Sequence, residues 1–249
     1  MRSIDLALEG PGVVGLVGRN GAGKSTLLSI LAGLRAPSQG SVVLDGEDVT
    51  HKPSTLRAHV GLLAEPPALH DEMSAAQFVE WCAGLRGITR SRRRARALDA
   101  MRDCGVLEVA SKRIGELSHG YRKRVGIAQA IVHEPALVLL DEPTSGLDPA
   151  QVLSMRVLVR ALGERALVVV SSHILAEIAQ TCDHVVMLEE GRLVLDRAWD
   201  PVKLEDGEVE LEIVLGQPHE EASRILRDTN LLTGIASVSH SANQARFIA

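Results

Sequence analysis

Aromatic residues are scarce in this chain of 249 residues, which contains two Trp, two Phe and one Tyr. Few side chains are therefore available for base stacking, on which proteins that bind single-stranded nucleic acid usually depend. Cysteine is rare as well. Cys82, Cys104 and Cys182 are an odd number without metal-site spacing, so the sequence predicts buried thiols in a reducing compartment and no disulfide framework.

Long apolar runs are also missing. The sequence has no run of about 18 apolar residues, and no basic segment followed by an apolar stretch at its start, so we expect neither a membrane span nor a signal peptide. Positive charge is not in excess, because the net charge is -5. This balance gives no general argument for nucleic-acid binding. With 45% hydrophobic and 24% charged residues, the chain has the composition of one large domain with at most a small appendage.

The most informative segment is GRNGAGKST at residues 18–26, which fits the phosphate-binding pattern G-x-x-x-x-G-K-[ST]. A β-branched apolar run precedes it and a stretch with helical spacing follows, as the motif requires. Glycines allow backbone N–H groups to approach an anion, and the helix N-terminus and the lysine add positive charge. The alternative is a Gly-rich turn with a solvated lysine. The sequence predicts a polyphosphate site in which Ser25 also serves Mg²⁺, built from Gly18, Arg19, Asn20, Gly21, Ala22, Gly23, Lys24, Ser25 and Thr26.

Strand and helix patterns alternate along most of the chain. This alternation indicates an α/β fold with a mainly parallel sheet, an antiparallel edge and a helical insertion. Strands are expected at 2–9, 12–17, 41–44, 59–63, 136–140, 166–170 and 184–188, with a hairpin turn at 45–46; helices are expected at 26–33, 73–110, 121–133, 150–162 and 174–182.

Residues 206–249 differ in character. An alternating segment at 208–214, a helical pattern at 218–227 and a weak strand at 235–239 predict a small β-α-β appendage. Because it ends in mid-strand, we expect it to be incomplete or to use a neighbour's edge. The predicted division is a main domain at 1–205 that contains the phosphate loop, with a helical subdomain at about 66–118, and an appendage at 206–249.

Residues 90–96, RSRRRAR, are the most basic patch in the chain. They could contact nucleic acid or acidic lipid. The favoured interpretation is a solvated helix face, with Ser91 as the helix cap.

Asp141 and Glu142 follow a continuous apolar run and lie at the predicted carboxyl edge of the sheet, from which the phosphate loop also emerges. Two carboxylates at that edge need a cation. We expect Asp141 to hold Mg²⁺ and Glu142 to orient a water molecule for attack on a γ-phosphate.

Further motifs carry a family resemblance. LSHGY at 117–121 precedes the acid pair, PTSGLD at 143–148 follows it, and SSH at 171–173 comes later. Over residues 3–195 the chain resembles the nucleotide-binding subunit of an ATP-binding cassette (ABC) transporter, of the exporter-type branch. The resemblance implies a P-loop nucleotide hydrolase that binds ATP and Mg²⁺.

The resemblance also assigns roles to single residues. It implies that residues 18–26, with the catalytic Lys24, hold the phosphates, that His173 contacts the γ-phosphate and Glu142 the water, and that Ser118 and Gly120 act in trans on the nucleotide of a second subunit. Two ATP molecules would then lie between two subunits, in a homodimer or a heterodimer, with Asp148 at the contact. In the family, closure and opening of this pair drive a membrane permease.

Two departures from the family pattern change the expected site. Glu65 occupies the position at which the family usually has Gln; it can still meet Mg²⁺ or water, but it adds negative charge. No aromatic residue precedes Lys24, whereas the family has one on an earlier loop that stacks on adenine; either the given sequence begins after that residue, or nucleotide binds without this platform. Because stacking contributes about 1–3 kcal/mol per base in nucleic-acid binders, a tenfold or larger loss of ATP affinity is predicted.

The leading hypothesis is therefore the ATPase of an exporter-type transporter, peripheral on the inner face of the cell membrane and paired with a separate permease. A soluble ABC ATPase that acts on nucleic acid or ribosomes is the alternative, and the arginine-rich patch is its only support. A regulatory cassette without turnover is a third reading, against which the presence of Lys24, Asp141, Glu142 and His173 argues.

Overall fold

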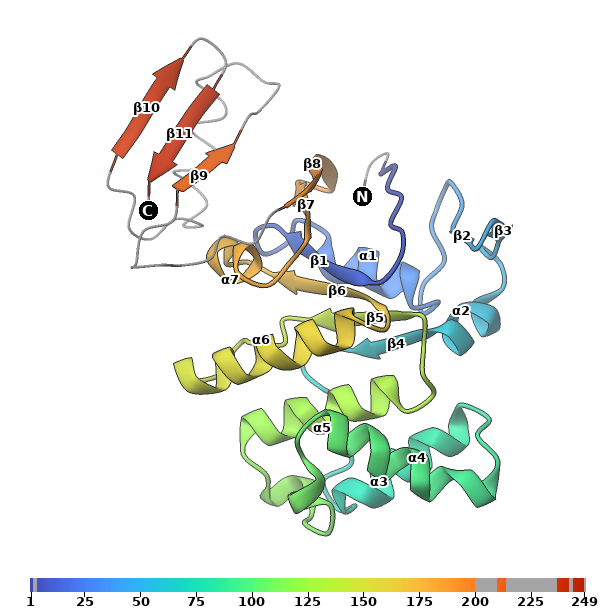
Figure 1. The fold of residues 1–249 in the computed structure, drawn as a ribbon. Helices are drawn as coiled ribbons and strands as arrows, with labels where there is room; N and C mark the ends of the chain where they lie inside the picture. Colours follow the sequence, from blue (N-terminus) through green and yellow to red (C-terminus); the bar gives the residue numbers. More distant parts are fainter. Residues whose placement is uncertain (2–3, 200–209, 214–236, 242–243, 249) are drawn as a thin grey trace.

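A six-stranded sheet forms the centre of the computed structural model, which describes residues 1, 4–199, 210–213, 237–241 and 244–248 (Figure 1). The strand order is β4-β5-β6-β1-β7-β8; the first five strands run parallel, and β8 pairs antiparallel with β7. The expectation of a mainly parallel sheet is confirmed. The strands are β1 (Gly12–Val17), β4 (Val60–Leu63), β5 (Leu137–Asp141), β6 (Leu167–Ser172), β7 (His184–Glu189) and β8 (Arg192–Ala198).

Helices cover both faces of the sheet, because its central strands are apolar on both sides. In β1, Val13 and Val17 belong to one core cluster, whereas Val14 and Leu16 belong to the other. The first cluster lies under α5 (His119–Ile131), α6 (Pro149–Gly163) and α7 (Leu175–Ala179); the second lies under α1 (Lys24–Leu31) and α2 (Pro53–His59).

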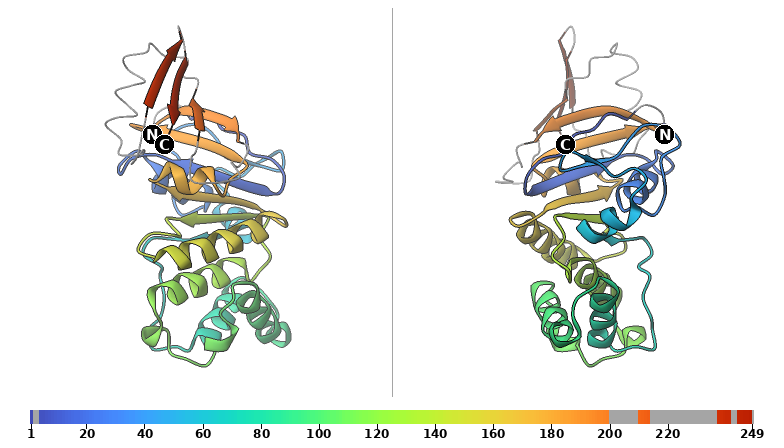
Figure 2. Two further views of the ribbon diagram at one scale, coloured as in Figure 1. Left: turned by 60° about the vertical axis from the view of Figure 1, so that its left-hand side comes forward. Right: turned by 90° about the vertical axis from the view of Figure 1, so that its right-hand side faces the viewer.

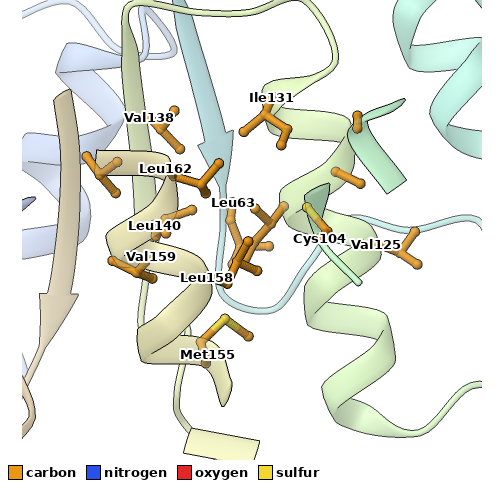
Figure 3. Packing of buried hydrophobic residues seen from close by; sticks show 14 of the residues in the cluster. Leu63, Cys104, Val125, Ile131, Val138, Leu140, Met155, Leu158, Val159 and Leu162 are labelled. Carbon is orange, nitrogen blue, oxygen red and sulfur yellow. The ribbon is translucent and has the colours of Figure 1, made fainter. Parts of the chain in front are cut away.

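The first cluster holds the strand ends in place from one side. Figure 3 shows Leu158 and Leu162 of α6 pointing toward Leu140 of β5, with Leu63 of β4 beside them. Leu140 is completely buried. Because buried side chains in such a core are closely packed, Leu140, the residue before the last one of β5, has little freedom to shift.

The helical insertion is confirmed as a separate group of helices that packs on α5 (Figure 2). It contains α3 (Ala75–Leu85) and α4 (Arg90–Asp103), followed by the 3₁₀ turns η1 (Leu107–Val109) and η2 (Ile114–Glu116). Ser74 begins α3 with a capping box, in which its hydroxyl and the Gln77 side chain each bond to the other's backbone N–H.

The arginine-rich patch lies on α4, as the helix-face interpretation predicted, but its cap was predicted wrongly. The helix begins two residues earlier than expected, with Thr89 at the N-cap position. Ser91 is instead an exposed residue inside the first turn. Arg96 bonds to Glu134 and to the carbonyl of Val132, so part of the patch is occupied by contacts within the chain.

Two other local predictions differ from the structure. Residues 4–9 form no strand. Ile4, Leu6 and Leu8 are half-buried against the second cluster, so their alternation with polar residues reflects a segment with one buried side, whose backbone does not pair with a strand. The expected strand at 41–44 is reduced to β2 (Val43–Leu44), which forms a hairpin with β3 (Glu47–Asp48).

The described C-terminal strands form a separate antiparallel sheet with the order β10-β11-β9. Its strands are β9 (Glu210–Ile213), β10 (Ser237–Ser241) and β11 (Gln244–Ile248). The helix expected at 218–227 lies outside the described residues. The proposed boundary at residue 206 therefore stays a prediction.

The three cysteines are buried, as expected. Burial raises the pKa of the Cys82 thiol to about 11 and that of Cys182 to about 12, which makes both thiols poor nucleophiles. None of the helices in the described ranges combines the length and the apolar character that a membrane span requires.

Candidate functional site

The predicted phosphate loop connects β1 to α1. Gly21 and Gly23 have φ values of 85° and 108°, in the left-handed region that residues with side chains avoid. At Gly18 a Cβ atom would lie 2.5 Å from the carbonyl oxygen of Leu188 in the neighbouring strand β7. The loop conformation therefore depends on glycine at these positions.

Lys24 is the first residue of α1 and is only 6% exposed. Its ammonium group donates a hydrogen bond to the carbonyl of Gly18 over 2.6 Å and lies 3.5 Å from Glu142 Oε1. The lysine thus spans the loop and reaches the end of β5. Ser25 follows as an exposed residue on the first turn of the helix, and Thr26 is half-buried.

The acid pair lies at the end of β5, as the sequence predicted. Asp141 is 7% exposed, and its Oδ1 accepts a hydrogen bond of 2.5 Å from the hydroxyl of Ser171 in β6. The same hydroxyl accepts a hydrogen bond of 2.9 Å from the backbone N–H of Glu142. Ser171 therefore fixes both acids at once. Sequence reasoning quoted Ser171 only as part of the SSH motif and gave it no role.

Glu142 has a φ of 47°, which is unusual for a residue with a side chain. This turn directs its carboxylate toward both Lys24 and His173, whose Nδ1 lies 2.9 Å from Glu142 Oε2. We call Lys24, Asp141, Glu142, Ser171 and His173 the catalytic edge. Its members lie at or after the carboxyl ends of β5 and β6 and at the start of α1, which follows β1; these three strands are neighbours in the sheet.

Glu65, which follows β4, does not join the catalytic edge directly. Its carboxylate lies 3.3 Å from the ammonium group of Lys123, a completely buried residue of α5. Lys123 also donates a hydrogen bond of 2.6 Å to the backbone carbonyl of Glu142. Glu65 is therefore connected to Glu142 through Lys123, a residue that sequence reasoning did not single out.

Residues 118–120, which we call the signature turn, lie at the start of α5. Ser118 caps the helix and accepts a hydrogen bond of 3.5 Å from the N–H of Tyr121. His119 Nε2 lies 3.2 Å from the carbonyl oxygen of Ser145, so the turn packs on the segment after β5. Asp148 in turn caps α6 and accepts from the N–H of Gln151.

Within the described part of the chain, no hydrogen bond or ion pair joins Ser118, Gly120 or Asp148 to residues 18–26. The structure therefore brings together only one part of the predicted site. The catalytic edge is assembled, and the signature turn is a separate helix N-terminus.

The residues at the catalytic edge suit Mg²⁺ and a polyphosphate. No group of three or more His, Cys, Asp or Glu side chains that could hold a metal ion occurs in the described ranges. Mg²⁺ does not need such a group, because it commonly takes one or two protein oxygens and completes its shell with phosphate and water. The carboxylate of Asp141 and the hydroxyl of Ser25 provide oxygens of this kind.

Four aromatic side chains make contacts elsewhere. Phe78 and Trp81 pack with His70 in the helical insertion, Tyr121 donates to Glu108, and Trp199 donates to the carbonyl of Ala179. The predicted weakness of adenine binding is not tested by these contacts and stays a prediction.

Residues 1–145 match the family described as ABC transporter. The chain belongs to the ABC transporter family. It is 35% identical over 196 residues to the ABC transporter ATP-binding protein NatA of Bacillus subtilis (strain 168), an alignment that covers 78% of this chain and 80% of NatA. It is therefore an ABC ATPase, the ATP-binding and ATP-hydrolysing subunit of a transporter.

Two further relatives support this assignment. The chain is 35% identical over 193 residues to the bacitracin transport ATP-binding protein BcrA of Bacillus licheniformis; the match covers 77% of this chain but spans only 62% of BcrA. The dimeric ABC cassette MJ0796, solved in a post-hydrolysis state with ADP and Pi, has a TM-score of 0.70 and 25% identity, and the match covers 78% of this chain and 88% of MJ0796. The P-loop ABC ATPase fold is thus confirmed.

Proposed function

We propose that this ABC ATPase powers export through a separate membrane permease, and that it does so from the cytoplasmic face of the membrane as one of two paired ATPase subunits. The observation that carries the ATPase part is the meeting of Lys24, Glu142 and His173 at the carboxyl edge of the sheet. Similarity to BcrA, a bacitracin transport protein, supports export.

In the proposed reaction the loop holds the phosphates of ATP. Lys24, which bonds to Gly18 and faces Glu142 in this structure, would exchange these partners for the β- and γ-phosphate oxygens. Its low exposure means that the ammonium group needs such a replacement partner.

Asp141 and Ser25 would hold Mg²⁺, which supplies positive charge that neutralises the charge developing on the phosphate oxygens. Asp141 is well placed because the Ser171 hydroxyl already orients one of its oxygens. Glu65, which contacts Lys123 as the backbone of Glu142 does, would reach the metal or its water shell.

Glu142 would orient and polarise the attacking water, and His173 would donate a hydrogen bond to the γ-phosphate. A carboxylate in this role accounts for about 10²–10⁴ of the rate, with the remainder coming from positioning and charge neutralisation. The contact between His173 and Glu142 keeps both side chains at the same point of the edge.

The signature turn would complete the ATP site of a second subunit. Ser118 and Gly120 are at a helix N-terminus, which suits an anion, yet they have no contact with the chain's own loop in the described residues. The dimer of MJ0796 with ADP and Pi supports an arrangement of two subunits. Asp148, exposed at the start of α6, would lie at the contact.

A capture experiment tests this proposal. Tagged Glu142→Gln protein, incubated with ATP and native membranes, is expected to retain a closed ATP-bound dimer and to elute with a multi-span protein in stoichiometric amount, as mass spectrometry would show. Wild-type protein with ADP is the matched control and should release that partner. Recovery of ribosomes or DNA-bound factors without a membrane protein would contradict the transport role.

A further inference from the structure

Lys123 is the most unusual charged residue in the described part of the chain. It lies on α5, and its side chain is completely buried. Lysine is almost never buried to this degree unless it is paired, because removing an ammonium group from water is costly. Burial accordingly lowers the pKa of Lys123, while Glu65, Glu142 and Glu177 oppose this effect. The residue therefore needs an explanation beyond packing.

The contacts of Lys123 lead to two acids on different strands. Its ammonium group is 3.3 Å from the Glu65 carboxylate, after β4, and 2.6 Å from the carbonyl oxygen of Glu142, after β5. Glu177 is the third acid nearby, but its carboxylate already accepts hydrogen bonds from Thr144 and Ser172. The ammonium group of Lys123 therefore contacts the Glu65 carboxylate and the backbone carbonyl of Glu142.

The backbone carbonyl of Glu142 accepts two hydrogen bonds that hold its turn, one of them from Lys123. The other, of 3.2 Å, comes from the N–H of Ser145, and Glu142 itself is in the left-handed region. A residue with a side chain holds this conformation only when surrounding contacts enforce it. Ser171 fixes the N–H of Glu142, and Lys123 fixes its carbonyl.

We infer that Lys123 is a positioning residue for ATP hydrolysis, which holds the backbone turn of Glu142 and ties it to Glu65. This inference rests on the proposed role of Glu142. Lys123 belongs to the helix that begins at the signature turn, and Glu65 lies where the chain leaves the sheet for the helical insertion. One cation therefore connects the catalytic edge to both junctions with the helical part.

Glu65 and Lys123 also form a matched pair of charges. A carboxylate at position 65 adds negative charge close to the expected phosphates and near Glu142. The ammonium group of Lys123 offsets this charge from the buried side, at the cost of its own desolvation. Removal of one member alone leaves either the completely buried Lys123 or Glu65, whose side chain is 32% exposed, without its partner, whereas removal of both charges does not.

The test compares Lys123→Met, Glu65→Gln and the double variant in the full chain. For Lys123→Met we expect kcat for ATP hydrolysis to fall at least about tenfold while KM for ATP changes less than about threefold, because positioning acts on the transition state. Lys52→Met is the control, since Lys52 pairs with Glu47 on the surface.

The double variant separates positioning from folding. It contains no unpaired charge at this place, so its thermal midpoint should lie above those of both single variants and close to that of wild type. Its kcat should nevertheless remain at least about fivefold below that of Glu65→Gln, because the bond to the Glu142 carbonyl is still missing. If the double variant and Glu65→Gln have equal kcat values, Lys123 serves only to balance charge and the inference is wrong.

A second measurement does not depend on turnover. Hydrogen exchange of the amide of Ser145, followed by mass spectrometry of a peptide that contains residues 142–145, should be faster in Lys123→Met and in the double variant than in wild type and Lys52→Met. Unchanged exchange would overturn the inference. A wild-type protein that hydrolyses no ATP would contradict the proposed function. The hydrogen-exchange measurement would still decide whether Lys123 holds the turn of Glu142.

Discussion

The catalytic edge and the signature turn carry motifs of the same family, but they differ in how many of their side chains contact one another. At the catalytic edge, side chains from three strands meet: Lys24 lies 3.5 Å from Glu142, His173 is 2.9 Å from the same carboxylate, and Ser171 bonds to both acids. At the signature turn, Ser118 is exposed and caps its own helix. The fold assembles the catalytic edge, whereas in the signature turn Ser118 and His119 are exposed and Gly120 is buried.

The difference follows from where each motif lies. The carboxyl ends of neighbouring parallel strands must meet at one edge, so residues that follow β1, β5 and β6 are brought together by the sheet itself. The start of α5 is under no such constraint, because α5 packs across the face of the sheet and against the helical insertion. Within the described residues no hydrogen bond or ion pair joins this helix N-terminus to residues 18–26, which is consistent with a role toward a second subunit.

Of the changes considered, loss of Lys24 from the catalytic edge should reduce ATP hydrolysis most. Lys24→Ala removes the only side-chain cation that contacts both the loop and Glu142 in the described residues, so we expect ATP hydrolysis to fall about 10²–10³-fold. Lys52→Ala, a surface lysine in an exposed ion pair, should stay within about twofold of wild type. A steady-state phosphate-release assay measures both; a Lys24→Ala rate above a tenth of wild type would contradict the account.

Loss of the Ser171 hydroxyl, which bonds to both Asp141 and Glu142, should lower activity less than loss of Lys24. Ser171→Ala leaves the buried Asp141 carboxylate and the Glu142 N–H without a shared partner, which should lower the free energy of unfolding by about 1–3 kcal/mol. Misplacement of two acids should also lower kcat roughly tenfold.

Denaturant unfolding and ATPase kinetics check this second prediction. Ser154→Ala is the matched control, because the Ser154 hydroxyl accepts one hydrogen bond from Arg124 in an exposed contact. If Ser171→Ala has the kcat of Ser154→Ala, Ser171 does not position the acids.

The smallest effect is expected from a residue that belongs to neither region. Burial, helped by Arg86 and Arg96, lowers the pKa of His133 from 6.5 to about 4. Between these values the unfolded chain binds a proton that the folded chain does not, so stability should fall as pH decreases from about 6.5 toward 4. His133→Gln should show a shallower decrease in thermal midpoint from pH 7 to pH 5, and identical slopes would contradict the prediction.

Much of the catalytic edge could be predicted from the sequence. The spacing of Gly18, Lys24 and Ser25 defines the loop, and the apolar run before Asp141 indicates a strand buried on both faces, which places the acid pair at the strand's end. These inferences use short-range patterns. They succeeded because each motif lies at a strand end whose position is set by the parallel sheet.

Contacts made by residues outside the motifs could not be predicted in this way. Ser171 and Lys123 hold Asp141 and Glu142 through pairs that are about 20 or 30 positions apart, and no local period reports such pairs. The strand β8 was missed although Leu193 and Leu195 alternate with exposed residues. The same kind of alternation at residues 4–9 gave a strand that is absent, because alternation reports a half-buried side and not a hydrogen-bonded neighbour.

The central claim is that the catalytic edge of one chain works with the signature turn of another, and a mixing experiment tests it most directly. Lys24→Ala and Ser118→Glu should each be nearly inactive alone, because one lacks a working loop and the other has an acid where the partner's phosphates would lie. In an equimolar mixture with ATP, half of the dimers contain both chains and one intact site of two, so about a quarter of the wild-type rate should return. A mixture that stays as inactive as its components, beside an active wild type, would contradict the account.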